Sequence, residues 1–175
     1  MKQLTMVMAI DRNGALGRGN DLIIRDKKDM DFFKSVTKNK TTIMGYKTWL
    51  SIGAKPLPGR TAIVLTSTPV AAEIAHPGDT AFFVNCKEEA LRIARAINRD
   101  AVVIGGGQVY REFQQDADVI WMTTWDTVIE DADVFLSASI YDGRIGETIE
   151  RLTHKDGFTG LIRAYKWADP EKKNG

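Results

Sequence analysis

The sequence is poor in the residues from which disulfide scaffolds and metal centres are built. It has one cysteine, Cys86, and two histidines in 175 residues. A single cysteine cannot form an internal disulfide, which excludes the stapled secreted scaffolds and fits a reducing compartment. The histidines, His76 and His154, lie far apart without neighbouring cysteines, so no metal-ligand spacing is recognisable. We therefore expect a cytoplasmic protein that binds no metal ion.

Long apolar runs and an excess of one charge are also missing. Every apolar stretch is shorter than the roughly 18 residues that would span a bilayer, and Asp11 and Arg12 interrupt the N-terminal stretch too early for a signal sequence. Lys and Arg total 24 against 23 Asp and Glu, a net charge of +1 that supplies no field for a polyanionic backbone. We expect neither a membrane nor a nucleic acid as a partner.

The chain does contain short β-branched apolar runs that alternate with longer amphipathic stretches. The predicted strands are residues 4–10, 41–44, 61–66, 81–84, 101–104 and 119–124. Near-continuous apolar runs such as 101–104 are typical of parallel strands buried on both faces, and residues 87–98 have helical spacing. Residues 158–167 predict a strand that returns antiparallel along an edge. The pattern predicts one α/β domain over residues 1–175, with a frayed tail at about 168–175.

A carboxylate near the start of the first long helix borders an apolar stripe. Asp26 is a suitable N-cap. In the helix that follows it, Asp29 lies on the same face as Met30 and Phe33. Two interpretations stay open at this point. Asp29 is either a first-turn acid that serves the cap, or a carboxyl group at the mouth of an apolar pocket, where burial would raise its pKa.

Two junctions between a strand and a helix carry glycine. In residues 44–49 the strand ends at Gly45, with Lys47 and Thr48 close by, and in residues 104–110 three glycines follow a strand. Glycine lets the backbone approach a ligand closely, and the amides that open a helix attract anions. The first junction is also common without a ligand, and neither has Walker A or GxGxxG spacing. Together they indicate a dinucleotide that lies across strand ends.

A loop stiffened by Pro56 and Pro58 presents Arg60 just before a strand. The planar guanidinium group matches a carboxylate, and a rigid loop lowers the entropic cost of holding it in place. A surface arginine after an ordinary turn would give the same local sequence.

Together these segments resemble the dihydrofolate reductase family, from Leu4 to at least Phe135. The resemblance rests on three blocks in register: Leu16, Gly17, Leu22, Asp29, Phe33 and Thr37 in the first, residues 44–60 in the second, and residues 104–110 in the third. It implies a three-layer α/β fold whose central, mostly parallel, twisted sheet has about eight strands, an antiparallel C-terminal edge and flanking helices. It also implies NADPH-dependent reduction of 7,8-dihydrofolate to tetrahydrofolate.

The resemblance further implies roles for individual residues. Asp29 and Thr123 would be the catalytic pair that holds the pterin, and Arg60 would bind the glutamate α-carboxylate. The other substrate-binding residues would be Thr5, Met6, Val7, Met30, Phe33, Ile52, Leu57 and Ile104. NADPH would contact Ala9, Ile10, Leu16, Gly17, Asn20, Gly45, Tyr46, Lys47, Thr48, Thr66, Ser67, Gly105, Gly106, Gly107, Gln108, Val109 and Tyr110. The family also implies a cis bond between Gly105 and Gly106 and a mobile lid at residues 15–24.

The chain departs from the family at Ile23 and Ile24, where the family usually has Pro-Trp. That tryptophan donates to a water near the pterin, and isoleucine has no donor. We therefore expect folate and NADPH to bind, with altered turnover and lowered affinity for trimethoprim. Tyr46 replaces a frequent arginine, so the preference for NADPH over NADH depends on Lys47 and Ser67.

Two alternatives stay open. The NADPH-dependent pyrimidine reductase of riboflavin synthesis shares this fold, but its substrate needs neither Asp29 nor Arg60. A folate- and NADPH-binding relic would keep the pocket and would have lost turnover together with the tryptophan. Under the main hypothesis the partner is a small molecule, dihydrofolate, and the protein is a monomer.

Overall fold

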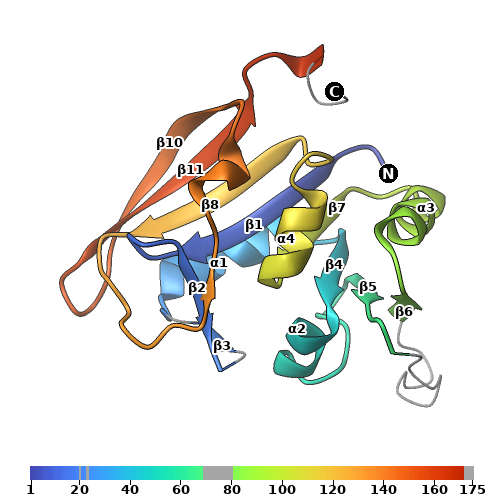
Figure 1. The fold of residues 1–175 in the computed structure, drawn as a ribbon, viewed down its shortest axis with the longest axis horizontal. Helices are drawn as coiled ribbons and strands as arrows, with labels where there is room; N and C mark the ends of the chain where they lie inside the picture. Colours follow the sequence, from blue (N-terminus) through green and yellow to red (C-terminus); the bar gives the residue numbers. More distant parts are fainter. Residues whose placement is uncertain (20, 23, 69–80, 172–175) are drawn as a thin grey trace.

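A computed structural model describes residues 1–19, 21, 22, 24–68 and 81–171. Its centre is an eight-stranded sheet of order β10-β11-β8-β1-β7-β4-β5-β6 (Figure 1). The parallel strands are β1 (Leu4–Ile10), β4 (Thr41–Gly45), β5 (Thr61–Leu65), β6 (Ala81–Val84), β7 (Ala101–Gly105) and β8 (Val119–Trp125). The two antiparallel strands, β10 (Arg144–Thr153) and β11 (Thr159–Trp167), complete one edge. This confirms the predicted fold class.

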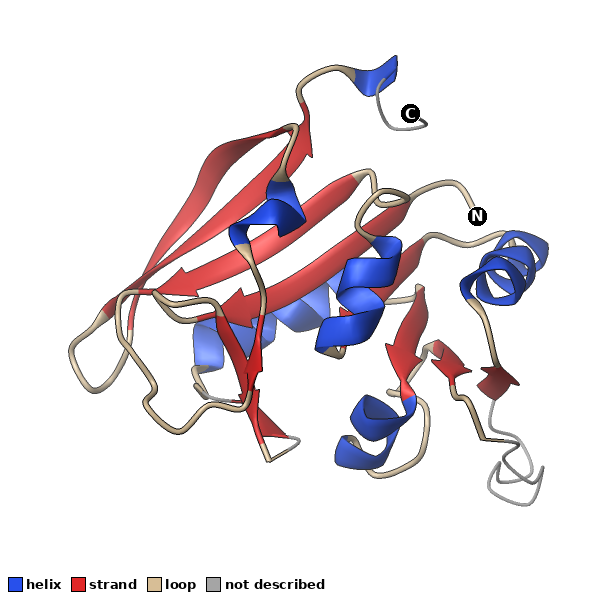
Figure 2. Cartoon of the chain, viewed as in Figure 1, coloured by secondary structure: helices blue, strands red, loops and turns tan. Residues whose placement is uncertain are grey.

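Helices cover both faces of the sheet (Figure 2). They are α1 (Lys27–Thr37), α2 (Tyr46–Ser51), α3 (Lys87–Ile97), α4 (Gly107–Phe113) and a short 3-10 helix, η2 (Ala138–Tyr141). A second small sheet, β3-β2-β9, joins β2 (Ala15–Arg18), β3 (Asp21–Leu22) and β9 (Val134–Phe135). It contains most of the segment predicted as a lid. In the described part of the chain, no helix has the length and apolar character needed to cross a bilayer.

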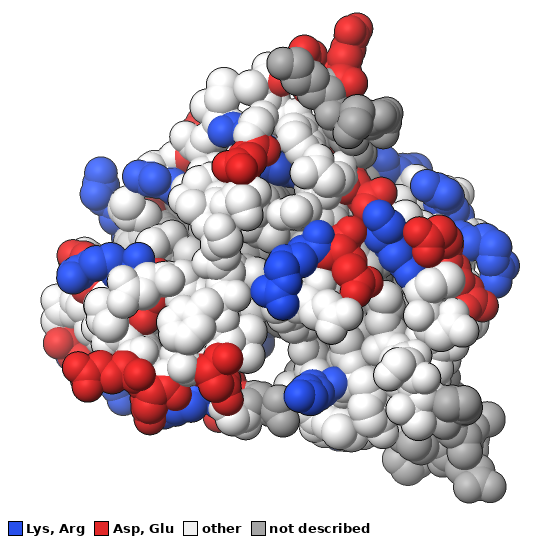
Figure 3. All heavy atoms as spheres, in the orientation of Figure 1, with Lys and Arg blue, Asp and Glu red and all other residues white. Residues whose placement is uncertain are grey.

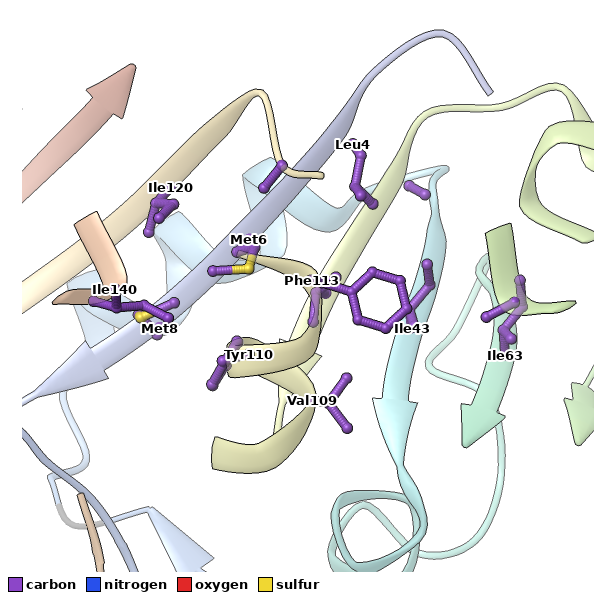
Figure 4. Close-up of a cluster of buried hydrophobic side chains, with 14 of the residues drawn as sticks. Leu4, Met6, Met8, Ile43, Ile63, Val109, Tyr110, Phe113, Ile120 and Ile140 are labelled. Atoms are coloured by element: carbon purple, nitrogen blue, oxygen red, sulfur yellow. The ribbon is translucent and has the colours of Figure 1, made fainter. Parts of the chain in front are cut away.

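The main hydrophobic core lies between the sheet and the pair α3 and α4. Met6 and Met8 of β1 and Ile43 of β4 pack there with Tyr110 and Phe113 of α4 (Figure 4). On the other face, α2 buries Trp49 against β4 and β5. Phe32 of α1 meets Trp121 of β8 edge to face, with ring centroids 5.8 Å apart. The alternation of side chains along each strand therefore separates an α3 and α4 side from an α1 and α2 side.

The structure corrects the prediction for the C-terminal edge. β11 was expected to be the edge strand, but it lies between β8 and β10, and β10 is outermost. The hydrophobic pattern of the sequence does not indicate β10 as a strand, because nine of its ten residues are exposed or half-buried. An edge strand with no buried face lacks the apolar alternation by which strands are recognised. The predicted tail at 168–175 extends beyond the described residues.

Candidate active site

Asp29 and Thr123 meet at the junction of α1 with the sheet. The Asp26 side chain caps α1 by accepting a hydrogen bond from the Asp29 backbone N–H at 2.9 Å. This cap starts the helix so that the Asp29 side chain points toward β8, where the Thr123 hydroxyl donates to Asp29 Oδ1 at 2.6 Å. The side chain that caps the helix is therefore that of Asp26, whereas the Asp29 carboxylate points to the sheet.

The surroundings of Asp29 favour its protonated form. Burial raises the pKa of this carboxyl above its ordinary value, the hydrogen bond from Thr123 opposes the shift, and the nearby Asp26 adds to it. The net pKa is raised. A carboxyl group that is fixed by a donor on one oxygen can bind a ligand's N–H groups, and a pKa raised by burial is typical of functional carboxyl groups.

The register of β1 against β8 determines which of the predicted β1 residues point to the side of the sheet on which Asp29 lies. Ala9 pairs with Thr123, and the paired side chains lie on the α1 side. Val7 and Thr5, two and four residues before Ala9, fall on that face as well. The side chains of Met6 and Ile10 belong to the core on the opposite face. Their predicted contacts with substrate and cofactor can therefore involve only the backbone, because successive strand residues alternate.

The two glycine turns predicted from the sequence lie next to each other. A Cβ atom on Gly45 would approach Gly106 N to 3.8 Å, and one on Gly105 would approach the Thr48 hydroxyl of α2 to 3.3 Å. The peptide bond between Gly105 and Gly106 is cis, as the family resemblance implies. A Cβ atom on Gly107 would meet Val134 of β9 at 2.8 Å. The turns and the small sheet thus converge at the carboxyl ends of β4 and β7.

We expect Gly105→Ala to destabilise the fold and to weaken NADPH binding. Gly105 has φ +132°, which an L side chain rarely adopts, and the added methyl group would crowd Thr48. Strain of this kind costs about 1–3 kcal/mol of unfolding free energy. Gly157→Ala is the matched control, since Gly157 has φ +93° and open space around it. Denaturant unfolding and NADPH titration of both variants check this prediction. Equal NADPH affinity in the two variants would count against the cofactor role of the turn.

The other predicted cofactor residues divide into buried and exposed groups. Val109 and Tyr110 are core residues of α4, and the Tyr110 hydroxyl donates to the Val7 carbonyl at 2.7 Å. Burial raises the pKa of Tyr110. Gln108 donates to Glu112 along the exposed side of the helix. Lys47 is exposed and has no ion pair in the described part of the chain. Asn20 lies outside the described residues.

Thr66 and Ser67 follow β5, the neighbour of β4 in the sheet. Because Gly45 pairs with Leu65, these two residues lie near the same edge as the Gly45 turn. The Thr66 hydroxyl donates to the Thr68 carbonyl, and Ser67 is exposed. Leu16 and Gly17, on β2, are half-buried, and the Leu16 side chain lies 3.7 Å from a Cβ position on Gly107.

The apolar residues predicted to contact the pterin and its tail come from three separate segments. Met30 and Phe33 lie on α1, Ile52 and Leu57 follow α2, and Ile104 lies on β7; all five are half-buried. Ile52 and Ile104 pack against the same cluster on the α1 and α2 side of the sheet. Because these side chains are partly exposed, they can contact an apolar ligand.

Arg60 is held rigidly at the C-terminal end of α1. Its Nε donates to the carbonyl and hydroxyl of Thr37, Nη1 donates to the Pro58 carbonyl and Nη2 to the Lys34 carbonyl. A guanidinium group has five N–H donors, so one donor on each Nη stays available. Desolvation lowers the pKa of Arg60, although the group remains charged at neutral pH. Two parallel donors match a carboxylate.

Ile24 is buried where the family has its tryptophan. Its side chain is 8% exposed and packs in a cluster with Trp125, Leu152 and Ile162. Ile23 lies outside the described residues. The Trp125 side chain is completely buried, and its indole nitrogen has no hydrogen-bond partner among the described residues. Trp125 is two residues from Thr123 on β8, so the two share a face of the sheet.

His154 supports the start of α1, a role that the sequence analysis did not assign. Its Nδ1 accepts a hydrogen bond from the Asp156 N–H, so Nε2 donates to the Arg25 carbonyl at 3.1 Å. The imidazole ring stacks on Phe158 with a centroid distance of 4.3 Å. No sequence signal predicts this contact, because His154 and Arg25 are 129 residues apart.

The fold is α/β, and the site combines two glycine turns at the carboxyl ends of parallel strands with the half-buried carboxylate of Asp29. The chain belongs to the dihydrofolate reductase family, whose model matches residues 3–155. A dihydrofolate reductase of Neisseria meningitidis is 35% identical over 138 residues, which cover 79% of this chain and 81% of that protein. One of Bacillus subtilis is 36% identical over 120 residues, covering 69% and 67%.

A solved structure supports the same assignment. Dihydrofolate reductase from Enterococcus faecalis, complexed with NADP(H) and RAB-propyl, superimposes with a TM-score of 0.79 and 26% sequence identity. The match covers 95% of this chain and 97% of that one. The likeness therefore includes the antiparallel C-terminal strands as well as the parallel part of the sheet.

Proposed function

We propose that this protein is an NADPH-dependent dihydrofolate reductase that converts 7,8-dihydrofolate to 5,6,7,8-tetrahydrofolate. The observation that carries the proposal is the 2.6 Å hydrogen bond between Thr123 and the half-buried Asp29, on a sheet whose carboxyl edge brings two glycine turns together. Membership of the family and the NADP(H) complex of the Enterococcus faecalis enzyme support the activity and the cofactor.

The residues at the carboxyl edge fit a dinucleotide. Side chains on Gly45, Gly105 and Gly106 would fill the space between the two turns, and the exposed Lys47 offers a cation for a phosphate group. NADPH, when bound, supplies the hydride that reaches C6 of the pterin. In our proposal Thr66 and Ser67 join Lys47 at the 2′-phosphate, and this group selects NADPH over NADH.

The chain's own residues would bind and orient the pterin. Asp29 accepts hydrogen bonds from its 2-amino group and N3, and Thr123 fixes the orientation of that carboxylate. Half-buried apolar side chains of α1 and β7 exclude water from the ring, and Arg60 positions the glutamate tail. N5 receives its proton through water, because the contacts of Asp29 are on the other side of the ring. We also propose that the enzyme works as a cytoplasmic monomer.

We propose that Ile24 lowers both turnover and the affinity for trimethoprim. Ile24→Trp is expected to raise turnover and tighten trimethoprim inhibition, because the indole supplies a donor that isoleucine lacks. Since Ile24 is packed against Trp125 and Ile162, the larger ring should cost about 1–3 kcal/mol of stability. Ile24→Leu, which conserves volume, is the control. Steady-state kinetics and inhibition curves test the proposal; unchanged turnover and unchanged inhibition in Ile24→Trp would contradict it.

The loss of NADPH absorbance on addition of dihydrofolate tests the proposed activity. A reductase gives sustained, stoichiometric NADPH consumption, whereas a binding relic gives ligand binding without turnover. The pyrimidine substrate of riboflavin synthesis, assayed in parallel, separates the two reductases. Turnover of the pyrimidine and not of dihydrofolate would overturn the proposal.

A further inference from the structure

A hollow separate from the Asp29 site lies on the opposite face of the sheet. It has a volume of about 690 Å³ and is enclosed by residues 11–14, by η2 and by strands β8, β10 and β11. Met122 lines it, whereas the next residue, Thr123, points to the other side and binds Asp29. We call this hollow the β11 groove. It lies on the face drawn in Figure 3, where basic and acidic side chains are mixed at the left of the view.

Arg163 of β11 lines the β11 groove, and its guanidinium group has no hydrogen-bond acceptor among the described residues. Its Nε is fully buried and has no hydrogen-bond partner. Among the described residues the guanidinium group makes neither a hydrogen bond nor an ion pair. A buried donor without an acceptor is costly, and in folded proteins such groups are nearly always paired. Arg144, in contrast, also has a buried Nε but donates three hydrogen bonds to backbone carbonyls.

A second unpaired arginine lies beside it. Arg151 of β10 pairs in register with Leu161, two residues before Arg163 on β11, so the two arginines occupy diagonal positions. Arg151 also has no hydrogen bond or ion pair with any described residue. Both arginines line the groove. Two neighbouring guanidinium groups repel each other unless an anion lies between them.

The acidic groups of the β11 groove are already paired. Asp11 accepts hydrogen bonds from the backbone N–H groups of Asn13, Ala15 and Ile129. Asp126 pairs with Arg12 at 2.6 Å. Neither carboxylate contacts Arg151 or Arg163. Three arginines and two aspartates line the groove, so its net charge is +1.

The remaining lining suits the apolar body of a small molecule. Leu161 and Ile140 contribute aliphatic surface, and Tyr141 and Tyr165 stack with their ring centroids 4.8 Å apart. A volume of about 690 Å³ is within the range of small-molecule sites. The planar fork of arginine favours a carboxylate, which it can bind through two parallel hydrogen bonds.

We propose that the β11 groove binds an aromatic carboxylate, with the carboxylate on Arg163 and Arg151 and the ring beside Leu161 and the tyrosine pair. The site is independent of the proposed reductase activity, because Arg151 and Arg163 lie on the face of the sheet that turns away from Asp29. The carboxylate would supply the acceptor that Arg163 Nε lacks.

Calorimetric titration with 1-naphthoate tests this site, with saturating NADPH and folate present so that the proposed active site is filled. We expect one molecule to bind per chain. Arg163→Gln and Arg151→Gln should each weaken binding about tenfold or more, the loss that follows when a charge-assisted hydrogen bond is removed. Arg95→Gln, which removes an exposed charge on α3, is the matched control and should leave binding unchanged. The uncharged analogue 1-naphthamide should bind at least about tenfold more weakly.

Three results would overturn the proposal: no binding of 1-naphthoate, equal binding by wild type and both arginine variants, or equal binding of 1-naphthoate and 1-naphthamide by wild type. Thermal unfolding of each variant shows whether it is folded. Should Arg163→Gln fail to fold, Arg151→Gln and the naphthamide comparison still decide, because neither changes Arg163, whose Nε is buried.

Discussion

Asp29→Asn is expected to lower kcat/KM for dihydrofolate by about two orders of magnitude or more, the loss that usually follows when a group that stabilises charge in the transition state is removed. The asparagine side chain keeps the size of aspartate and can still accept the Thr123 hydrogen bond. It cannot carry the negative charge that holds a polarised pterin. Steady-state kinetics with NADPH and dihydrofolate measure the loss. Thr123→Val is the companion variant, which should cause a smaller loss because Asp29 keeps its charge.

The same substitution should change the pH dependence of stability. Burial raises the pKa of Asp29, so between its ordinary pKa and the raised one the folded state binds more protons than the unfolded state. The contribution of Asp29 to stability is therefore greatest at low pH and falls as the pH rises through this window. Asparagine does not titrate. We expect Asp29→Asn to gain Tm relative to wild type as the pH rises; a constant Tm difference across the window would contradict this.

Arg60→Gln is expected to raise the KM for dihydrofolate by about tenfold to a hundredfold, with a small change in kcat. Loss of a hydrogen bond between charged groups costs about 1.5–3 kcal/mol of binding free energy. The effect should appear mainly in KM, because Arg60 binds the tail and is remote from the reacting atoms.

Arg60→Lys tests whether geometry or charge is responsible. Lysine keeps the charge but cannot bind the backbone of α1 and a carboxylate at the same time through one planar group. It should therefore recover only part of the loss. A substrate that lacks the glutamate tail should bind wild type and both variants equally well. Weaker binding of that substrate by the variants would show that Arg60 acts only through the packing of α1.

The parallel half of the fold was predictable because most of its strands, all but the edge strand β6, are buried on both faces. Runs such as Ala62 to Leu65 contain almost no polar residue, and their ends agree with the structure to within one residue. β10 was missed because its stability depends on pairing with β11 and very little on burial. The side-chain directions of Met6 and Ile10 follow from the β1 register, which becomes known only when β1 is paired with β8.

The candidate site was predictable where local sequence determines geometry. Asp26 and Asp29 follow capping rules, and the glycine turns follow from strand ends and backbone freedom. The partner of Asp29, Thr123, came from the family resemblance, since the two residues are 94 positions apart. The contact of His154 with Arg25 and the unpaired Arg163 beside Arg151 likewise depend on tertiary contacts. Such contacts leave no periodic signal in a single sequence.

Transfer of deuterium from the cofactor is the most direct test of the central claim that this site reduces dihydrofolate. NADPH carrying deuterium on the reactive position of nicotinamide C4 is incubated with the wild-type protein and dihydrofolate, and the product is examined by NMR. We expect one deuterium per tetrahydrofolate, bound at C6, and formation of this labelled product about two orders of magnitude more slowly with Asp29→Asn. Oxidation of NADPH without deuterium at C6, or equal rates of transfer by the two proteins, would contradict the claim.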